Sequence, residues 1–153
     1  MRAASLLFVA LALLGGCGEK VAPINGCVPA GGLEPTCSFR NPEDMELLPD
    51  GHTLLISQMG SMNGDRPGSF ALFDTRSETI TRLPQFTAST EPPWGDPACT
   101  TVPGPEFSPH GIDLIRRPDG QWQLLAVNHG GRESVEFFQL LEESEGYRLA
   151  WRG

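Results

Sequence analysis

The sequence has little of what binding to nucleic acid or to an anionic membrane surface requires. Lys20 is the single lysine, and 11 basic residues stand against 19 acidic ones, which gives a formal net charge of −8. No run of Lys or Arg occurs in the chain. Because phosphate backbones and anionic lipids are bound by clustered basic side chains, this composition argues against both partners.

Sequence motifs of several enzyme classes are also missing. There is no G-x-S-x-G nucleophile elbow, no H-E-x-x-H, no phosphate-binding glycine loop and no dinucleotide fingerprint. The spacing of Cys and His suggests no zinc site. Serine-hydrolase and nucleotide chemistry therefore lose support.

What the chain does contain is many turn-forming residues. Of its 153 residues, 18 are Gly and 14 are Pro, with 39% hydrophobic and 20% charged residues. This length suggests one domain at most. Ordinary hydrophobicity with many turns favours a globular β protein over a coiled coil or a low-complexity segment.

The N-terminus has the features of an export signal. Arg2 is followed by an apolar run over residues 3–14 that is too short to span a bilayer. The run ends in Leu14-Gly-Gly-Cys17, which resembles the bacterial lipobox, so we expect residues 1–16 to be removed and Cys17 to be lipidated. This predicts an exported lipoprotein, anchored to a membrane in the periplasm or at the cell surface. An ordinary signal peptide cut near Gly16, with Cys17 left as a thiol, is the alternative, and it also exports the protein.

An odd number of cysteines follows the predicted lipid anchor. Export permits disulfides, and Cys27, Cys37 and Cys99 remain once Cys17 is set aside. Either one thiol is free or its partner lies outside this chain, and the pairing stays open. Residues 17–36 contain several prolines and a Gly-Gly pair without apolar periodicity, which predicts a tether leading into a domain over residues 37–153.

The domain contains an internal repeat. Two Pro-Asp-Gly turns, at residues 49–51 and 118–120, lie 69 residues apart. Each is flanked by strand-like apolar runs in the same order. We expect strands over residues 45–48, 53–57, 69–74 and 79–83, and again over 110–117, 121–127, 134–140 and 147–152.

The repeat predicts an all-β fold of propeller type. Units 43–83 and 110–152 are each a four-stranded antiparallel meander of 41 and 43 residues, which matches a propeller blade. Between them, residues 84–109 carry seven prolines, so we expect an ordered insertion without strand or helix. A small β-sandwich is the alternative, but its turns should not repeat in this register. Because propellers close with four to eight blades, we expect the chain to be part of a larger ring and to fold poorly alone.

Four side chains at predicted strand ends are candidates for chemistry. Glu43 and Asp44 are neighbours on one strand and point to opposite faces, so they can serve two different ions. Carboxylate oxygens suit calcium, with magnesium a weaker hypothesis, and a solvated acidic pair is the alternative. His110 and His129 can accept a proton near neutral pH and form a relay, or they are exposed turn and loop residues without a role. His52, after the first turn, is interpreted as a hairpin surface residue.

Three separated segments resemble one known family. Residues 41–51 (NPEDMELLPDG), 108–112 (SPHGI) and 125–129 (LAVNH) occur in the order and spacing of the paraoxonase (arylesterase) branch of the calcium-dependent six-bladed propellers, which are related to gluconolactonase and strictosidine synthase. The resemblance spans about residues 43–140 and covers only the N-terminal part of that family.

The resemblance implies a site and a reaction. Glu43 would bind a catalytic calcium, Asp44 and the backbone carbonyl of Ile112 a structural calcium, and His110 with His129 would activate water. The catalytic calcium would polarise the carbonyl of a lactone or aryl ester, and the water would attack it. The family's other calcium ligands belong to later blades. We therefore expect these 153 residues to be a truncated N-terminal portion without significant hydrolytic activity alone.

A second function class is compatible with the same residues. A non-catalytic, surface-exposed propeller that binds a ligand or a protein would keep Asp44 and Ile112 for stability and would need neither histidine. The sequence leaves open whether the protein is an enzyme.

Overall fold

A computed structural model describes residues 26–61, 65–144 and 146–153. Contacts divide the chain into two compact units, residues 1–37 and 38–153, and each is considered by itself. The predicted signal at residues 1–16, the predicted lipidation site Cys17 and the first half of the predicted tether lie outside the described residues. Within the described part of the chain, no helix is long and apolar enough to cross a membrane.

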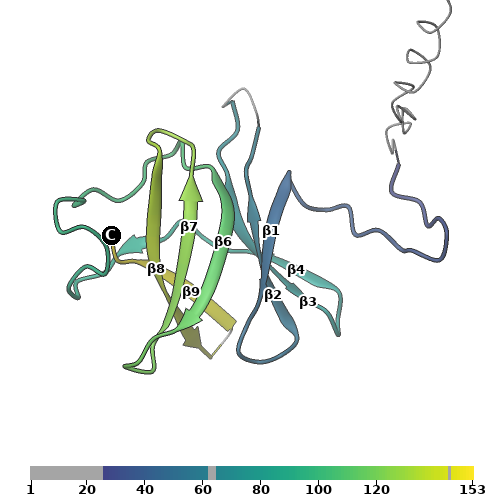
Figure 1. Cartoon of the computed structure of the whole chain (residues 1–153). Helices are drawn as coiled ribbons and strands as arrows, with labels where there is room; N and C mark the ends of the chain where they lie inside the picture. Colours follow the sequence, from purple (N-terminus) through teal and green to yellow (C-terminus); the bar gives the residue numbers. More distant parts are fainter. Residues whose placement is uncertain (1–25, 62–64, 145) are drawn as a thin grey trace, which may run out of the picture. The chain divides into compact units, whose positions relative to one another are not determined.

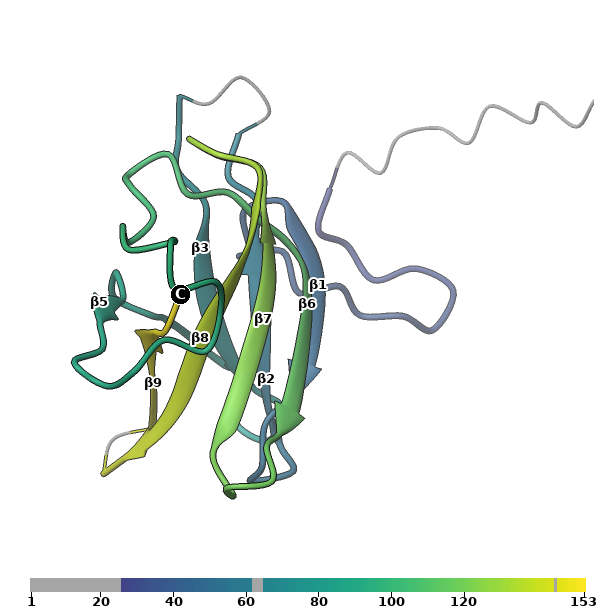
Figure 2. The same cartoon turned by 60° about the vertical axis from the view of Figure 1, so that its left-hand side comes forward.

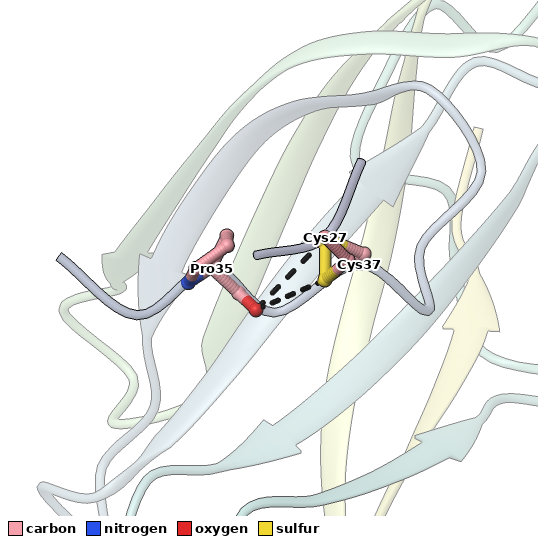
Figure 3. The surroundings of a disulfide bond; sticks show 3 residues. All are labelled: Cys27, Pro35 and Cys37. Atoms are coloured by element: carbon pink, nitrogen blue, oxygen red, sulfur yellow. Dashed lines mark hydrogen bonds between the residues drawn. A yellow bond between two sulfur atoms is a disulfide. The ribbon is translucent and has the colours of Figure 1, made fainter. Parts of the chain in front are cut away.

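In the first unit, the second half of the predicted tether is closed into a loop by a disulfide. Cys27 and Cys37 are bonded, with their Cα atoms 5.9 Å apart (Figure 3). Ala30 and Leu33 exchange two backbone hydrogen bonds of 3.0 Å across Gly31-Gly32, whose positive φ angles suit a tight turn. Cys99 of the second unit forms no disulfide with any described cysteine.

The second unit is all-β, as predicted, and the described residues contain no helix. Its first sheet has the antiparallel order β1-β2-β3-β4 (Figure 1). The strands are β1 (Pro42–Leu47), β2 (Thr53–Gln58), β3 (Ser69–Asp74) and β4 (Thr79–Arg82). This is the predicted first meander.

The second sheet repeats the meander and adds a short edge strand. Its order is β5-β9-β8-β7-β6, antiparallel except for the β5–β9 pair. The strands are β5 (Thr87–Ala88), β6 (Pro109–Arg116), β7 (Trp122–Asn128), β8 (Ser134–Glu143) and β9 (Gly146–Trp151). Strands β1 and β6, the first of each meander, lie side by side (Figures 1 and 2).

Two predictions about strand positions were wrong. The insertion at residues 84–109 was expected to contain no strand, but its proline-free stretch Thr87–Ala88 pairs in parallel with Ala150–Trp151. Strand β8 was expected to end at residue 140, but it continues to Glu143 because its pairing with β9 extends to the pair Glu143–Gly146. Strand β3 has the predicted bounds, and the remaining strands differ from theirs by one to three residues.

The two Pro-Asp-Gly turns use the same hydrogen bonds. The N–H groups of Gly51 and Gly120 donate to the carbonyls three residues earlier, at 3.0 and 2.9 Å. Both glycines have positive φ, +73° and +85°, which other residues adopt only with strain. The carboxylate of Asp50 also accepts the N–H of Thr53 at 2.8 Å and its hydroxyl at 2.6 Å. The repeated Pro-Asp-Gly sequence therefore forms the same hydrogen-bonded turn in both meanders.

The core lies between the two sheets. Buried apolar side chains from both sheets and from the insertion form one cluster. Its members include Leu55, Phe70 and Leu72 from the first sheet, Leu124, Ala126, Phe138 and Leu140 from the second, and Phe107 from the insertion. Four phenylalanines, including Phe86 and Phe107 of the insertion, contact one another with ring centroids 4.7–6.0 Å apart. The insertion is thus packed against the sheets through Phe86 and Phe107.

A second contact fixes the insertion along β9. The guanidinium groups of Arg117 and Arg152 each lie over the Trp94 ring, with their Cζ atoms 4.4 and 4.3 Å from its centroid. Arg152 donates from Nε and Nη2 to the Pro92 carbonyl at 3.1 and 2.8 Å. Cation–π contacts with a tryptophan are the strongest of their kind, so this stack holds the insertion against the sheet.

The first turn should contribute to stability in a pH-dependent way. Burial alone would raise the pKa of Asp50, but hydrogen bonds from Thr53 and His52 and the His52 charge lower it to about 2. A lowered pKa stabilises the fold above the ordinary value of 3.8, and this contribution is lost as the pH falls from about 4 to about 2. We expect Asp50→Asn to lower the free energy of unfolding at pH 7 by about 1–2 kcal/mol. In urea titrations, the difference in the free energy of unfolding between Asp50→Asn and the unmutated protein should become smaller below pH 4. The control is Glu142→Gln, which changes an exposed carboxylate and should lower the free energy of unfolding at neither pH.

Candidate functional site

The structure brings the two predicted site histidines together. His110 lies at the start of β6, and His129 directly follows β7, the strand paired with β6. Their ring centroids are 5.3 Å apart at an interplanar angle of 74°. The side chains are 46% and 44% exposed, so they are accessible and also in contact. Residues 19 apart in sequence meet because antiparallel pairing places Pro109 opposite Asn128.

Each imidazole lies within ion-pairing distance of a carboxylate. Oε2 of Glu43 lies 3.1 Å from Nε2 of His110, and Oε2 of Glu133 lies 2.6 Å from Nδ1 of His129. Because an ionised carboxylate can only accept hydrogen bonds, the bond to Glu133 places a proton on Nδ1 of His129. Nε2 of His129 is then the nitrogen of that ring able to accept a proton.

Asp44 contacts a different part of β6 from its neighbour Glu43. Its Oδ2 accepts the N–H of Ile112 at 2.9 Å, and its Oδ1 accepts the N–H of Met45 at 2.9 Å. The β1–β2 register shifts between Pro42 and Asp44, and this irregularity at Glu43 lets the two neighbouring carboxylates reach different partners. Among the predicted residues, Glu43 therefore joins the histidines, and Asp44 joins Ile112.

A buried serine links the strands that carry these residues. Ser57 of β2 is fully buried, and its hydroxyl donates to the His110 carbonyl at 2.6 Å. The same oxygen accepts the N–H of Asp44 at 3.1 Å. One side chain thus connects β1, β2 and β6 at the site. Nothing in its sequence position distinguishes Ser57 from other strand serines, and sequence analysis did not find it.

A buried asparagine shapes the loop that carries His129. Oδ1 of Asn128 accepts the N–H groups of Ser108 and Gly130 at 2.9 and 3.0 Å. Its Nδ2 donates to the carbonyls of Gly130 and Arg132, each at 3.0 Å. In addition, the N–H of His129 donates to the Ser108 carbonyl at 3.1 Å. Asn128 lies within the LAVNH segment, but only its burial shows that it organises the loop.

The histidines line an open pocket with a volume of about 670 Å³. Its wall also includes Ser108, Met59, and two charged side chains, Arg66 and Glu106. Glu133 was not among the predicted site residues, and its position four residues after His129 in a glycine-rich loop would not have singled it out. The pocket is large enough for a small ester or lactone.

The predicted calcium-binding residues offer oxygen atoms of the kind that calcium binds, but fewer than one calcium ion requires. Glu43 and Asp44 offer carboxylate oxygens, and Ile112 offers a backbone carbonyl, all of which suit calcium. Calcium takes six to eight oxygen ligands. In the part of the chain that the structure describes, no group of three or more His, Cys, Asp or Glu side chains is arranged to hold a metal ion. These donors alone do not form a complete coordination sphere.

His52 lies in the β1–β2 hairpin, as predicted, away from this pocket. Its Nδ1 is 3.8 Å from the Asp50 carboxylate and 3.6 Å from that of Asp74.

Comparison with known proteins adds no identification. No model of a known protein family matches the sequence, and no curated protein matches it.

The close approach of two loops at the site can be tested at Gly130. A Cβ atom there would collide with the carbonyl oxygen of Glu106, so Gly130→Ala must displace one of the two segments. We expect a loss of about 1–3 kcal/mol in the free energy of unfolding, typical of overpacking. At Gly111, in contrast, the nearest atom to an added Cβ is 3.9 Å away. Gly111→Ala is therefore the matched control, and equal midpoints of chemical unfolding for the two variants would contradict the close packing.

Proposed function

We propose that this protein is a calcium-dependent hydrolase of lactones or aryl esters, exported and lipid-anchored through Cys17, in which residues 37–153 supply the first blades of a propeller. The observation that carries the proposal is the pair His110 and His129. The rings are in contact, each has a carboxylate beside it, and both line one pocket.

The distribution of apolar side chains supports the propeller. In the first sheet, Leu55 faces the core, whereas Met45 and Leu47 lie on the opposite face and are 56% and 55% exposed. In the second sheet, Val127 and Val135 form a cross-strand pair on the face opposite the core. The outer faces of a two-layer sandwich are normally polar. Apolar residues on both faces of each sheet favour a stack that continues on both sides, as in a ring of blades.

In the proposed reaction, a histidine acts as general base. Glu133 holds the Nδ1 proton of His129, which leaves Nε2 to accept a proton from water. The water oxygen forms a bond to the carbonyl carbon, the bond to the alcohol oxygen breaks, and the proton passes from the imidazolium to that oxygen. His110, oriented by Glu43, is placed to act in the same way or to relay the proton.

Calcium, when bound, would polarise the substrate carbonyl and stabilise the charge that develops on its oxygen. Glu43 would contribute to one ion, and Asp44 with the Ile112 carbonyl to another. In this proposal, the remaining ligands come from further blades, and residues 1–153 alone should not hydrolyse esters.

A second candidate is a non-catalytic propeller that binds a ligand or a protein at the surface. It is favoured by the bond from the Ile112 N–H to Asp44 and by the Ser57 contacts. These interactions join the two sheets without either histidine side chain.

The test compares histidine variants of the protein expressed from its entire reading frame. We expect His110→Gln and His129→Gln each to lower kcat/KM for aryl esters and lactones by about 10²–10⁴-fold, with an unchanged unfolding midpoint. Removal of calcium by a chelator should abolish hydrolysis. His52→Gln should retain full activity. An unmutated protein that hydrolyses none of these substrates, or histidine variants with full activity, would refute the enzyme hypothesis.

A further inference from the structure

An ion pair between the partly exposed Arg132 and the buried Glu136 adjoins the loop that carries His129. Glu136 of β8 has no exposed surface, and its two carboxylate oxygens accept hydrogen bonds from Nε and Nη2 of Arg132, both at 2.8 Å. The Ser134 hydroxyl donates at 2.5 Å and the Trp151 indole N–H at 2.7 Å. The proposed reaction uses none of these four residues.

The chemistry of the pair keeps both groups charged. Burial alone would raise the pKa of Glu136, but hydrogen bonds from Arg132, Ser134 and Trp151 outweigh it, and the pKa lies below its usual value. The hydrogen bonds with Glu136 likewise raise the pKa of Arg132. The planar guanidinium donates to both carboxylate oxygens, a geometry that fixes direction as well as distance.

Stability alone is a poor explanation for this arrangement. Replacing a buried ion pair by apolar residues of similar volume is often neutral or stabilising, because taking charges out of water costs several kcal/mol. Unlike an apolar contact, the ion pair gives the backbone of Arg132 a defined orientation.

That backbone carries the group that orients His129. Glu133 follows Arg132 directly, and its carboxylate bonds to Nδ1 of His129 at 2.6 Å. The Arg132 carbonyl also accepts the Asn128 amide at 3.0 Å, so the loop is fixed at both ends. The Arg132 side chain is bound to the sheet, and the next side chain along the chain reaches the histidine.

We propose that Arg132 is a positioning residue for His129 and that Glu136 is its buried anchor. Together they hold residues 129–133 so that Glu133 keeps the proton on Nδ1 of His129 and leaves Nε2 as the base. The catalytic consequence rests on the proposed function, but the orientation of the imidazole can be measured without it.

The experiment uses protein from the entire reading frame, labelled with ¹⁵N-histidine, and records long-range ¹H–¹⁵N spectra of the imidazole rings. The His129 signals are assigned with His129→Gln. In the unmutated protein we expect the His129 pattern of a ring protonated on Nδ1. In Arg132→Gln we expect this pattern to shift toward the averaged pattern of mixed tautomers, while His52 stays unchanged. Arg132→Lys, which keeps the charge but not the two-pronged contact, should give a smaller shift.

Hydrolysis provides the second measurement. If the protein hydrolyses esters, Arg132→Gln should lower kcat by about tenfold to a hundredfold with little change in KM, because a small displacement of a catalytic group has a large effect on rate. Arg148→Gln is the matched control, since Arg148 forms an exposed ion pair with Glu143 of the same sheet at 2.6 Å. It should change neither the His129 spectrum nor kcat.

The outcomes separate this proposal from the proposed function. His129 signals that stay in place in Arg132→Gln, or that shift equally in Arg148→Gln, overturn the positioning role. If Arg132→Gln does not fold, the His129 spectrum of Arg132→Lys is compared with that of the unmutated protein. Unchanged His129 signals in Arg132→Lys then overturn the proposal. A protein without hydrolysis whose His129 pattern still depends on Arg132 refutes the enzyme hypothesis and supports the positioning role.

Discussion

The contact between β1 and β6 is the constraint on which the candidate site depends. These strands open the two meanders, and each carries part of the site at its first residues. The Ser57 hydroxyl and the Asp44 carboxylate join the strands by hydrogen bonds to the backbone of β6. Ser57 and Ile112 are buried, so losing either bond would leave a buried donor unpaired. Displacing one sheet against the other would therefore separate Glu43 from His110.

Much of the fold could be predicted because the chain repeats its turn chemistry. The two Pro-Asp-Gly turns fixed the hairpins, and β3 was predicted with the bounds that it has in the structure. Strand β5 could not be predicted, since two residues have no periodicity and their pairing depends on β9, about 60 residues later. The Cys27–Cys37 disulfide was left open because three cysteines allow several pairings and only geometry decides among them.

The candidate site was predicted in its principal residues but not in the residues that support them. Histidines and carboxylates at strand ends stand out by their chemistry. Ser57, Asn128 and Arg132 act through burial and backbone hydrogen bonds, which no local pattern reveals. The site is thus an accessible pair of imidazoles on a buried polar framework. A framework of this kind, with its hydrogen bonds satisfied, is what holds catalytic groups in place in enzymes.

The short strand β5 has a consequence for how the protein behaves among its neighbours. A strand edge with unpaired N–H and C=O groups is a template on which other chains can form sheets. Strand β9 is the outer strand of its meander, and β5 covers its last residues, while the N–H groups of Ser89 and Trp94 bond to the next carbonyls along the same edge. The proline-rich segment that follows cannot itself offer a long edge. The insertion therefore occupies the end of this edge, at residues 150–152, so that this part is not available for pairing with another chain.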